Sequence, residues 1–152
     1  MYQGMPMSII HLLVTQSLHV FWNPEDIVLG SLHSRTGVSR SVLLDSGADV
    51  ISYGMGEHSI VELAEALDAG IPVEDITYIA GTVVKAKSLD SIYDAEILPS
   101  FEDLKADKMN YARSFYTQYL NTDAFNGKRL VEPYSDHLYV VQNPPAAPLT
   151  QM

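Results

Sequence analysis

The stretch from Val50 to Pro72 limits the fold of this chain more than any other, because a strand, a glycine turn and a helix follow one another directly. Val50–Tyr53 is rich in β-branched and aromatic residues, as buried strands are. The chain must then turn at Gly54-Met55-Gly56. A strand joined to a helix in this way is a building unit of α/β folds, so the sequence predicts an α/β domain.

The helix of this unit is predicted over Ser59–Leu67. Ser59 and Glu62 have the spacing of a capping box, in which the two residues satisfy each other's backbone N–H groups. Further on, Gly70 favours a left-handed helix end and Pro72 blocks continuation. One apolar stripe is expected to pack this helix on the preceding strand, and it consists of Ile60, Leu63, Ala64 and Leu67.

We divide the chain into three parts. Residues 1–38 contain apolar runs that favour two short strands, with or without a helix, while residues 39–142 form the predicted domain. Residues 143–152 are rich in proline and favour an extended linker.

Within the domain, a second helix is predicted from Ser100 to about Leu120. Its core face is expected to contain Leu104, Tyr111, Ala112, Phe115 and Tyr119. A C-terminal β-hairpin is predicted from Arg129–Val131 and Leu138–Val141, with Pro133–Asp136 as its loop.

Composition excludes several classes of function. The net charge is -10, from 9 basic and 19 acidic residues, which disfavours nucleic acids and anionic membrane surfaces as partners. The apolar run Met5–Trp22 is interrupted by polar residues, so a buried element is expected there and not a membrane span. The absence of cysteine excludes disulfides and Cys-ligated metal or iron–sulfur sites, and it is in keeping with a cytoplasmic protein.

The candidate site lies at the glycine turn and consists of Tyr53, Gly54, Gly56, Glu57 and His58. Backbone N–H groups at the start of a helix can bind an anion, but the carboxylate of Glu57 would repel a phosphate there. Two interpretations therefore stay open: a structural turn, or a contact site for a ligand or another domain.

No other pattern in the sequence indicates chemistry. The five histidines form neither an HExxH motif nor a helical His-x-x-x-His pair, so no metal site is predicted. No G-x-S-x-G elbow is present, and no catalytic residue is predicted.

From Arg40 onward the chain resembles the N-terminal region of YgiQ-like radical SAM proteins. The matching segments, in the family's order, are RSVLLDSGADVISYGMGEHSIVELAEAL, EDITYIAGTVVKAK, ILPSFEDLKADKMNYARSF and YVVQNPPAAPLT. YGMGE and LPSFEDLKADK together with NPPAAPL are specific in combination. The residues before Ser39 match poorly, apart from Ile27–Gly30.

The resemblance implies a partial Rossmann-like sheet of the cobalamin-binding-domain type, with flanking helices and the C-terminal hairpin. Cobalamin itself is not predicted, because the Asp-x-His-x-x-Gly loop of such domains is missing. In the family, a CxxxCxxC motif in a following barrel holds a [4Fe–4S] cluster that cleaves S-adenosylmethionine. Both cofactors are implied for the full-length family alone, and this chain is expected to hold neither.

The expected role is that of an N-terminal accessory domain, which organises or covers an active site supplied by C-terminal sequence outside this chain. The radical SAM barrel is then the main partner, and the chain alone is not expected to be an enzyme. The alternative is a stand-alone module that binds a small ligand or a protein. Surface left bare by a missing barrel would also favour self-association, through Ile9–Trp22 and the hairpin near Leu138–Val141.

Overall fold

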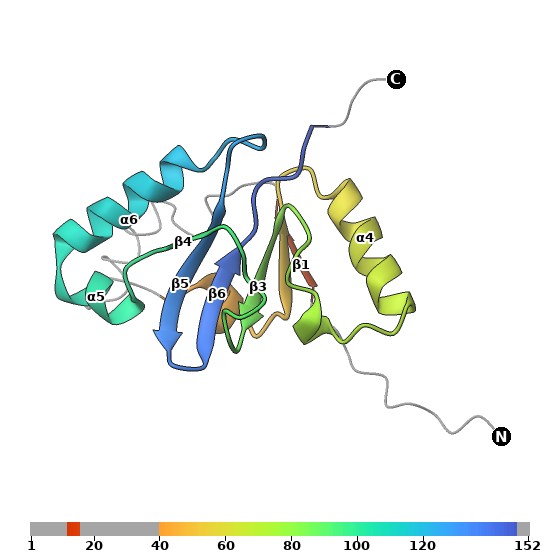
Figure 1. Cartoon of the computed structure of the whole chain (residues 1–152), viewed down its shortest axis with the longest axis horizontal. Coiled ribbons are helices and arrows are strands. Elements are labelled where there is room, and N and C mark those ends of the chain that lie inside the picture. The colour runs from red at the N-terminus through yellow and green to blue at the C-terminus, as the bar shows by residue number, and fades with distance from the viewer. Residues whose placement is uncertain (1–11, 16–39, 149–152) are drawn as a thin grey trace.

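The computed structural model of the protein describes residues 12–15 and 40–148, which form one mixed sheet with helices on both sides. Figure 1 shows α4 on one side of the sheet and α5 and α6 on the other. The strands are β1 (Leu12–Thr15), β2 (Val50–Tyr53), β3 (Thr82–Ala86), β4 (Ala95–Ile97), β5 (Arg129–Ser135) and β6 (Leu138–Gln142). The helices are α3 (Val42–Asp45), α4 (Glu57–Asp68), the short 3-10 helix η1 (Val73–Asp75), α5 (Phe101–Ala106) and α6 (Lys108–Leu120).

The six strands are ordered β1-β2-β3-β6-β5-β4. β1 pairs with β2 and β4 pairs with β5 in parallel, while the three inner pairs are antiparallel. The predicted α/β class and the C-terminal hairpin are confirmed. Since β6 lies between β3 and β5, it offers no free strand edge, and self-association through the hairpin near Leu138–Val141 stays a prediction.

The hairpin loop is shorter than predicted. β5 continues through Pro133 and Tyr134 to Ser135, which pairs with Leu138, so the chain turns at Asp136 and His137. The ladder shifts register between Pro133 and Ser135. Such an irregularity accommodates proline, which cannot donate a ladder hydrogen bond, and the predicted loop over Pro133–Asp136 is therefore wrong.

Two apolar cores lie on opposite faces of the sheet. We call the first the α4 face; it joins Leu63 and Ala66 of α4 to side chains that include Val50, Val84 and Val141. We call the second the α3 face; its members are Leu43, Ala48, Ile51, Tyr53, Val83 and Val140. Alternate residues of β2, β3 and β6 thus serve different cores, as the twofold repeat of a strand requires.

The predicted helix after β2 is confirmed, but its capping box is wrong, and its predicted apolar stripe meets the core only through Leu63 and Leu67. α4 begins two residues before Ser59, at Glu57, and Gly56 is its N-cap residue without a side-chain bond. Ser59 lies inside the helix, where its Oγ donates to the Ala80 carbonyl at 2.7 Å. The buried residues of α4 are Ser59, Leu63 and Ala66, whereas Ile60 and Ala64 are exposed.

The end of α4 follows the prediction. Gly70 has a φ of 83°, and its N–H donates to the Leu67 carbonyl at 2.9 Å. The N–H of Ile71 donates to the Ala66 carbonyl at 3.1 Å, which completes a Schellman motif.

The second predicted helix is two helices, and its predicted core face is largely wrong. Asp107 interrupts it in an extended conformation and caps α6 through a bond from the Met109 N–H to its carboxylate. Leu104 of α5 is buried as expected. In α6, however, Ser114 is the buried residue, while the predicted core residues Ala112, Phe115 and Tyr119 are exposed.

Most of residues 1–38 lie outside the described part of the chain. Leu12–Thr15 forms β1, and the other predictions for this segment, including the apolar run from Ile9 to Trp22, cannot be compared with the structure. Among residues 12–15 and 40–148, no helix has the length and apolar character needed to cross a membrane.

Candidate functional site

The glycine turn connects β2 to α4 at one end of the sheet. Gly54 has a φ of 70°, a left-handed conformation that costs glycine little and other residues more. Gly56 lies so close to β2 that an added Cβ would stand 2.7 Å from the Oγ of Ser52. The two glycines are therefore needed for different reasons, one for backbone conformation and one for close approach.

Tyr53 points away from solvent and holds a distant part of the chain. Its ring is buried on the α3 face, and its hydroxyl donates to the carbonyl oxygen of Asn143. Burial raises the pKa of Tyr53, because the phenolate would lose its hydration. This predicted site residue is thus a structural donor whose hydroxyl is already engaged.

Asn143 is the centre of the hydrogen bonds at this end of the sheet. It is 1% exposed, its N–H donates to the Thr82 carbonyl at 2.9 Å, and its side-chain amide donates to Thr82 Oγ1 at 3.1 Å. Its side-chain oxygen accepts from Arg129 Nε at 3.0 Å. The next residue is held as well, because the Gly81 N–H donates to the Pro144 carbonyl at 2.7 Å.

These bonds join the start of the predicted linker to the sheet. Figure 1 shows that the chain leaves the sheet at the same end at which α4 begins. Sequence reasoning treated Asn143 as the first residue of a linker, and an isolated asparagine before two prolines gives no signal of a buried hub. The signal available was the resemblance itself, which included the NPPAAPL segment.

The exposed side chains of the turn, next to the exposed Gly54, are Met55, Glu57 and His58. Glu57 occupies the first turn of α4, where a carboxylate favours the positive end of the helix dipole. Ser52, directly below, is buried, and its Oγ has no hydrogen-bond partner among the described residues. Of the predicted residues, Gly54, Glu57 and His58 are therefore exposed together above a buried strand end, while Tyr53 and Gly56 are buried; we call the exposed set with Met55 the ridge.

The chemistry available at this ridge is limited. In the described part of the chain, no three His, Asp or Glu side chains are grouped so that they could hold a metal ion. Neither ionisable side chain of the ridge, Glu57 or His58, is enclosed. An exposed ridge of mixed polarity fits a contact with another protein surface better than a reaction on a small molecule.

A cleft of about 500 Å³ lies at the opposite end of the sheet, and sequence reasoning missed it. Its lining includes Asp49, Lys85, Glu74 and His137. Lys85 Nζ and Asp49 Oδ1 are 3.7 Å apart, so they form a weak ion pair across it. These residues come from four separate segments, and no spacing in the sequence brings them together.

A buried carboxyl group on the α3 face was also missed. Glu132 of β5 is buried next to Tyr134, and one of its carboxylate oxygens, Oε1, has no partner among the described residues. Burial raises the pKa of Glu132 to about 7, although a hydrogen bond from Tyr134 lowers it in part. The hydroxyl of Tyr134 in turn accepts the Ser41 N–H at 2.8 Å, which ties β5 to the start of α3.

Comparison with known proteins identifies the family of this fold and turn. The family described as Radical SAM N-terminal matches residues 33–152. A UPF0313 protein of Clostridium botulinum (strain ATCC 19397 / Type A) is 41% identical over 114 residues, which cover 75% of this chain and 18% of that protein. A UPF0313 protein of Clostridium perfringens (strain SM101 / Type A) is 45% identical over 115 residues, which cover 75% and 17%.

The chain thus spans less than a fifth of the length of these curated relatives. No solved structure shows a significant match to it. The matched family covers the turn, α4, both cores and the anchored segment at Asn143, and the resemblance seen in the sequence is confirmed. The chain belongs to the Radical SAM N-terminal family, as a segment that corresponds to a small part of its UPF0313 relatives.

Proposed function

We propose that this chain is the N-terminal accessory domain of a radical SAM protein of the UPF0313 type. In this proposal, the end of the sheet that carries Tyr53–His58 faces the active site supplied by the rest of that protein. The observation that carries the proposal is the set of hydrogen bonds at Asn143, which holds the Pro-rich segment beside the turn. In the longer relatives, sequence that follows this segment would begin at the same end of the sheet.

The finer fold assignment is part of the proposal. A Rossmann-like origin is supported by the parallel pair β1 and β2 and by the helix α4 that follows β2 through a glycine turn. A cytoplasmic location is in keeping with the absence of cysteine.

The iron–sulfur cluster of such a protein does not fit the residues of this chain. Cysteine thiolates hold these clusters, and the chain contains no cysteine. The cluster and S-adenosylmethionine therefore belong to the other part of the protein. This chain would contribute shape alone, in that Met55, Glu57 and His58 cover one side of the active site and keep water from it.

The test uses the Clostridium perfringens relative with its matched region replaced by this chain. We expect the double variant Glu57→Ala/His58→Ala to lower the rate of S-adenosylmethionine cleavage roughly tenfold, about 1.4 kcal/mol in the barrier, without changing the iron content. The control is Glu62→Ala/Glu65→Ala, which removes exposed charges further along α4. Equal rates for both double variants would contradict the proposal.

The chain alone should bind no cluster. Anaerobic reconstitution of the purified chain, followed by iron and sulfide analysis, is expected to give neither element in stoichiometric amount. A stoichiometric cluster with a charge-transfer band would show that other residues replace cysteine, and the assignment of the cofactors to the rest of the protein would then fail.

A stand-alone small-ligand module is the second candidate, and the cleft lined by Asp49 and Lys85 favours it. Its mixture of acidic and basic side chains would suit a small zwitterion. A rise in the unfolding temperature of the isolated chain with added amino acids, abolished by Lys85→Ala, would support this alternative. If no added amino acid raises the unfolding temperature, the small-ligand alternative is contradicted.

A further inference from the structure

Helix α6 has its polarity reversed with respect to solvent. Its exposed residues are mostly apolar, and they are Lys108, Met109, Ala112, Arg113, Phe115, Tyr116, Tyr119 and Leu120. Its buried and half-buried residues are mostly polar, and they are Asn110, Tyr111, Ser114, Thr117 and Gln118. A helix that faces solvent normally shows the opposite arrangement, with polar residues exposed and apolar residues buried. We call the exposed set the outer face of α6.

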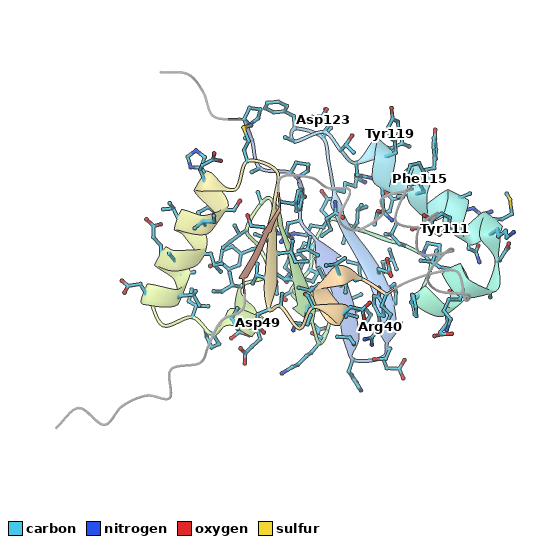
Figure 2. All side chains as sticks on the ribbon, turned by 180° about the vertical axis from the view of Figure 1, so that it is seen from behind. Arg40, Asp49, Tyr111, Phe115, Tyr119 and Asp123 are labelled. Carbon is cyan, nitrogen blue, oxygen red and sulfur yellow. The ribbon has the colours of Figure 1, made fainter. Side chains whose placement is uncertain are left out.

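The outer face of α6 exposes several aromatic side chains. Tyr116 and Tyr119 are 62% and 65% exposed, and Phe115 is 40% exposed. Figure 2 shows Phe115 and Tyr119 projecting outward from the helix. Tyrosine, phenylalanine and methionine are the residue types enriched where proteins bind one another, and exposed groups of them mark interaction sites.

We infer that the outer face of α6 is a docking surface for the part of the UPF0313-type protein that lies outside this chain. This inference rests on the proposed function and adds a surface to it. The relatives are several times longer than the matched region, so a large partner surface exists within them. The position of α6 also fits, because the connection that follows it lies beside the anchored segment. An added Cβ on Gly127 in this connection would stand 3.5 Å from Cδ of Pro145.

Charge favours this occupant over a second copy of the chain. The stretch Lys108–Leu120 contains Lys108 and Arg113 and no acidic residue, although the whole chain has a net charge of -10. Two copies that met through this face symmetrically would bring like charges together. The partner surface is therefore expected to be apolar with acidic groups at its border.

The experiment compares hydrogen exchange of α6 in the isolated chain and in the Clostridium perfringens relative that carries this chain in place of its matched region. We expect the amides of residues 108–120 to exchange at least about tenfold more slowly in the full-length protein. Tyr116→Asp should restore fast exchange there. The matched control is Tyr93→Asp, since Tyr93 is likewise a highly exposed tyrosine but lies outside α6.

Equal exchange of α6 in both proteins would overturn the inference. Slow exchange of α6 already present in the isolated chain would also overturn the inference. If that slow exchange depends on protein concentration, a second copy of the chain covers the face. If it does not, the chain's own N-terminal segment covers it. These readouts are independent of S-adenosylmethionine cleavage. Failure of the docking surface would thus leave the proposed function standing if Glu57→Ala/His58→Ala still impairs cleavage.

Discussion

α4 and α6 are similar in length, at 12 and 13 residues, but only α4 buries apolar side chains. α4 places Leu63 and Ala66 in the core of the α4 face, whereas the buried residue of α6 is Ser114. Both were predicted from apolar residues at helical spacing. The comparison teaches that such spacing identifies an amphipathic helix without saying whether its apolar face meets the domain itself or another surface.

The strongest test of this contrast is truncation of Leu63. Because Leu63 is buried in the core, Leu63→Ala should lower the free energy of unfolding by about 2–5 kcal/mol. Urea unfolding followed by circular dichroism measures this. A change below roughly 0.5 kcal/mol would mean that α4 is no better packed than the outer face of α6.

A second test compares the two faces of the sheet through the dependence of protein stability on pH. The α4 face has an apolar core, while the α3 face buries Glu132, whose pKa is raised from 4.5 to about 7. A carboxyl group with a raised folded-state pKa binds its proton more tightly in the folded protein, so stability should fall as pH rises from about 4.5 to 7. The full effect is about 3 kcal/mol, and it persists above pH 7.

Glu132→Gln should remove that loss, so the variant is expected to be more stable than the parent at pH 8 and closer to it at pH 4. The charged and titratable groups around this site include Tyr134, whose pKa is raised by burial and by the Glu132 charge, and Asp45. Unfolding midpoints in urea at the two pH values give the answer. Parallel pH profiles for parent and variant would place the carboxylate in contact with solvent.

The helix starts provide a smaller test. α6 is capped by the side chain of Asp107, while α4 starts at Gly56 without a side-chain cap. Asp107→Ala should therefore cost about 1 kcal/mol, and Gly56→Ser should fail to stabilise α4 because its Cβ would meet Ser52 Oγ. Gain of stability in Gly56→Ser would show that β2 can move away from the turn.

The smallest effect is expected on the outer face of α6. Tyr116→Ala should change the stability of the isolated chain by no more than about 0.5 kcal/mol, because the side chain is mostly exposed. Thermal unfolding measures it. A loss of more than 2 kcal/mol would mean that the face is already covered within this chain, and the contrast with α4 would disappear.

The features that were predicted correctly from the sequence are those that depend on neighbouring residues. Strand β2, the glycine turn, the helix after it and the left-handed Gly70 all follow from local backbone preferences, and each is present. The family resemblance was also sound, because it rested on several segments in a fixed order.

The predictions that the structure contradicts concern contacts between residues that are distant in sequence. Ser59 looks like a cap from its spacing to Glu62, but the Ala80 carbonyl, distant in sequence, engages its hydroxyl inside the helix. The candidate turn was placed correctly, while the role of Asn143 required knowledge that β3, β5 and Tyr53 converge on it. No pattern in a single sequence carries that information.

The central position of β6 has a consequence for synthesis. Among the strands of residues 12–15 and 40–148, β6 comes last in the sequence, yet it is the one that joins the β1-β2-β3 half of the sheet to the β5-β4 half. A growing polypeptide would expose two unfinished half-sheets until Gln142 had emerged from the ribosome. Chains that fold through such late, long-range pairing are slow to fold and prone to aggregate meanwhile. We therefore expect translation pauses before this point to favour misfolding and pauses after it to favour recovery of folded protein.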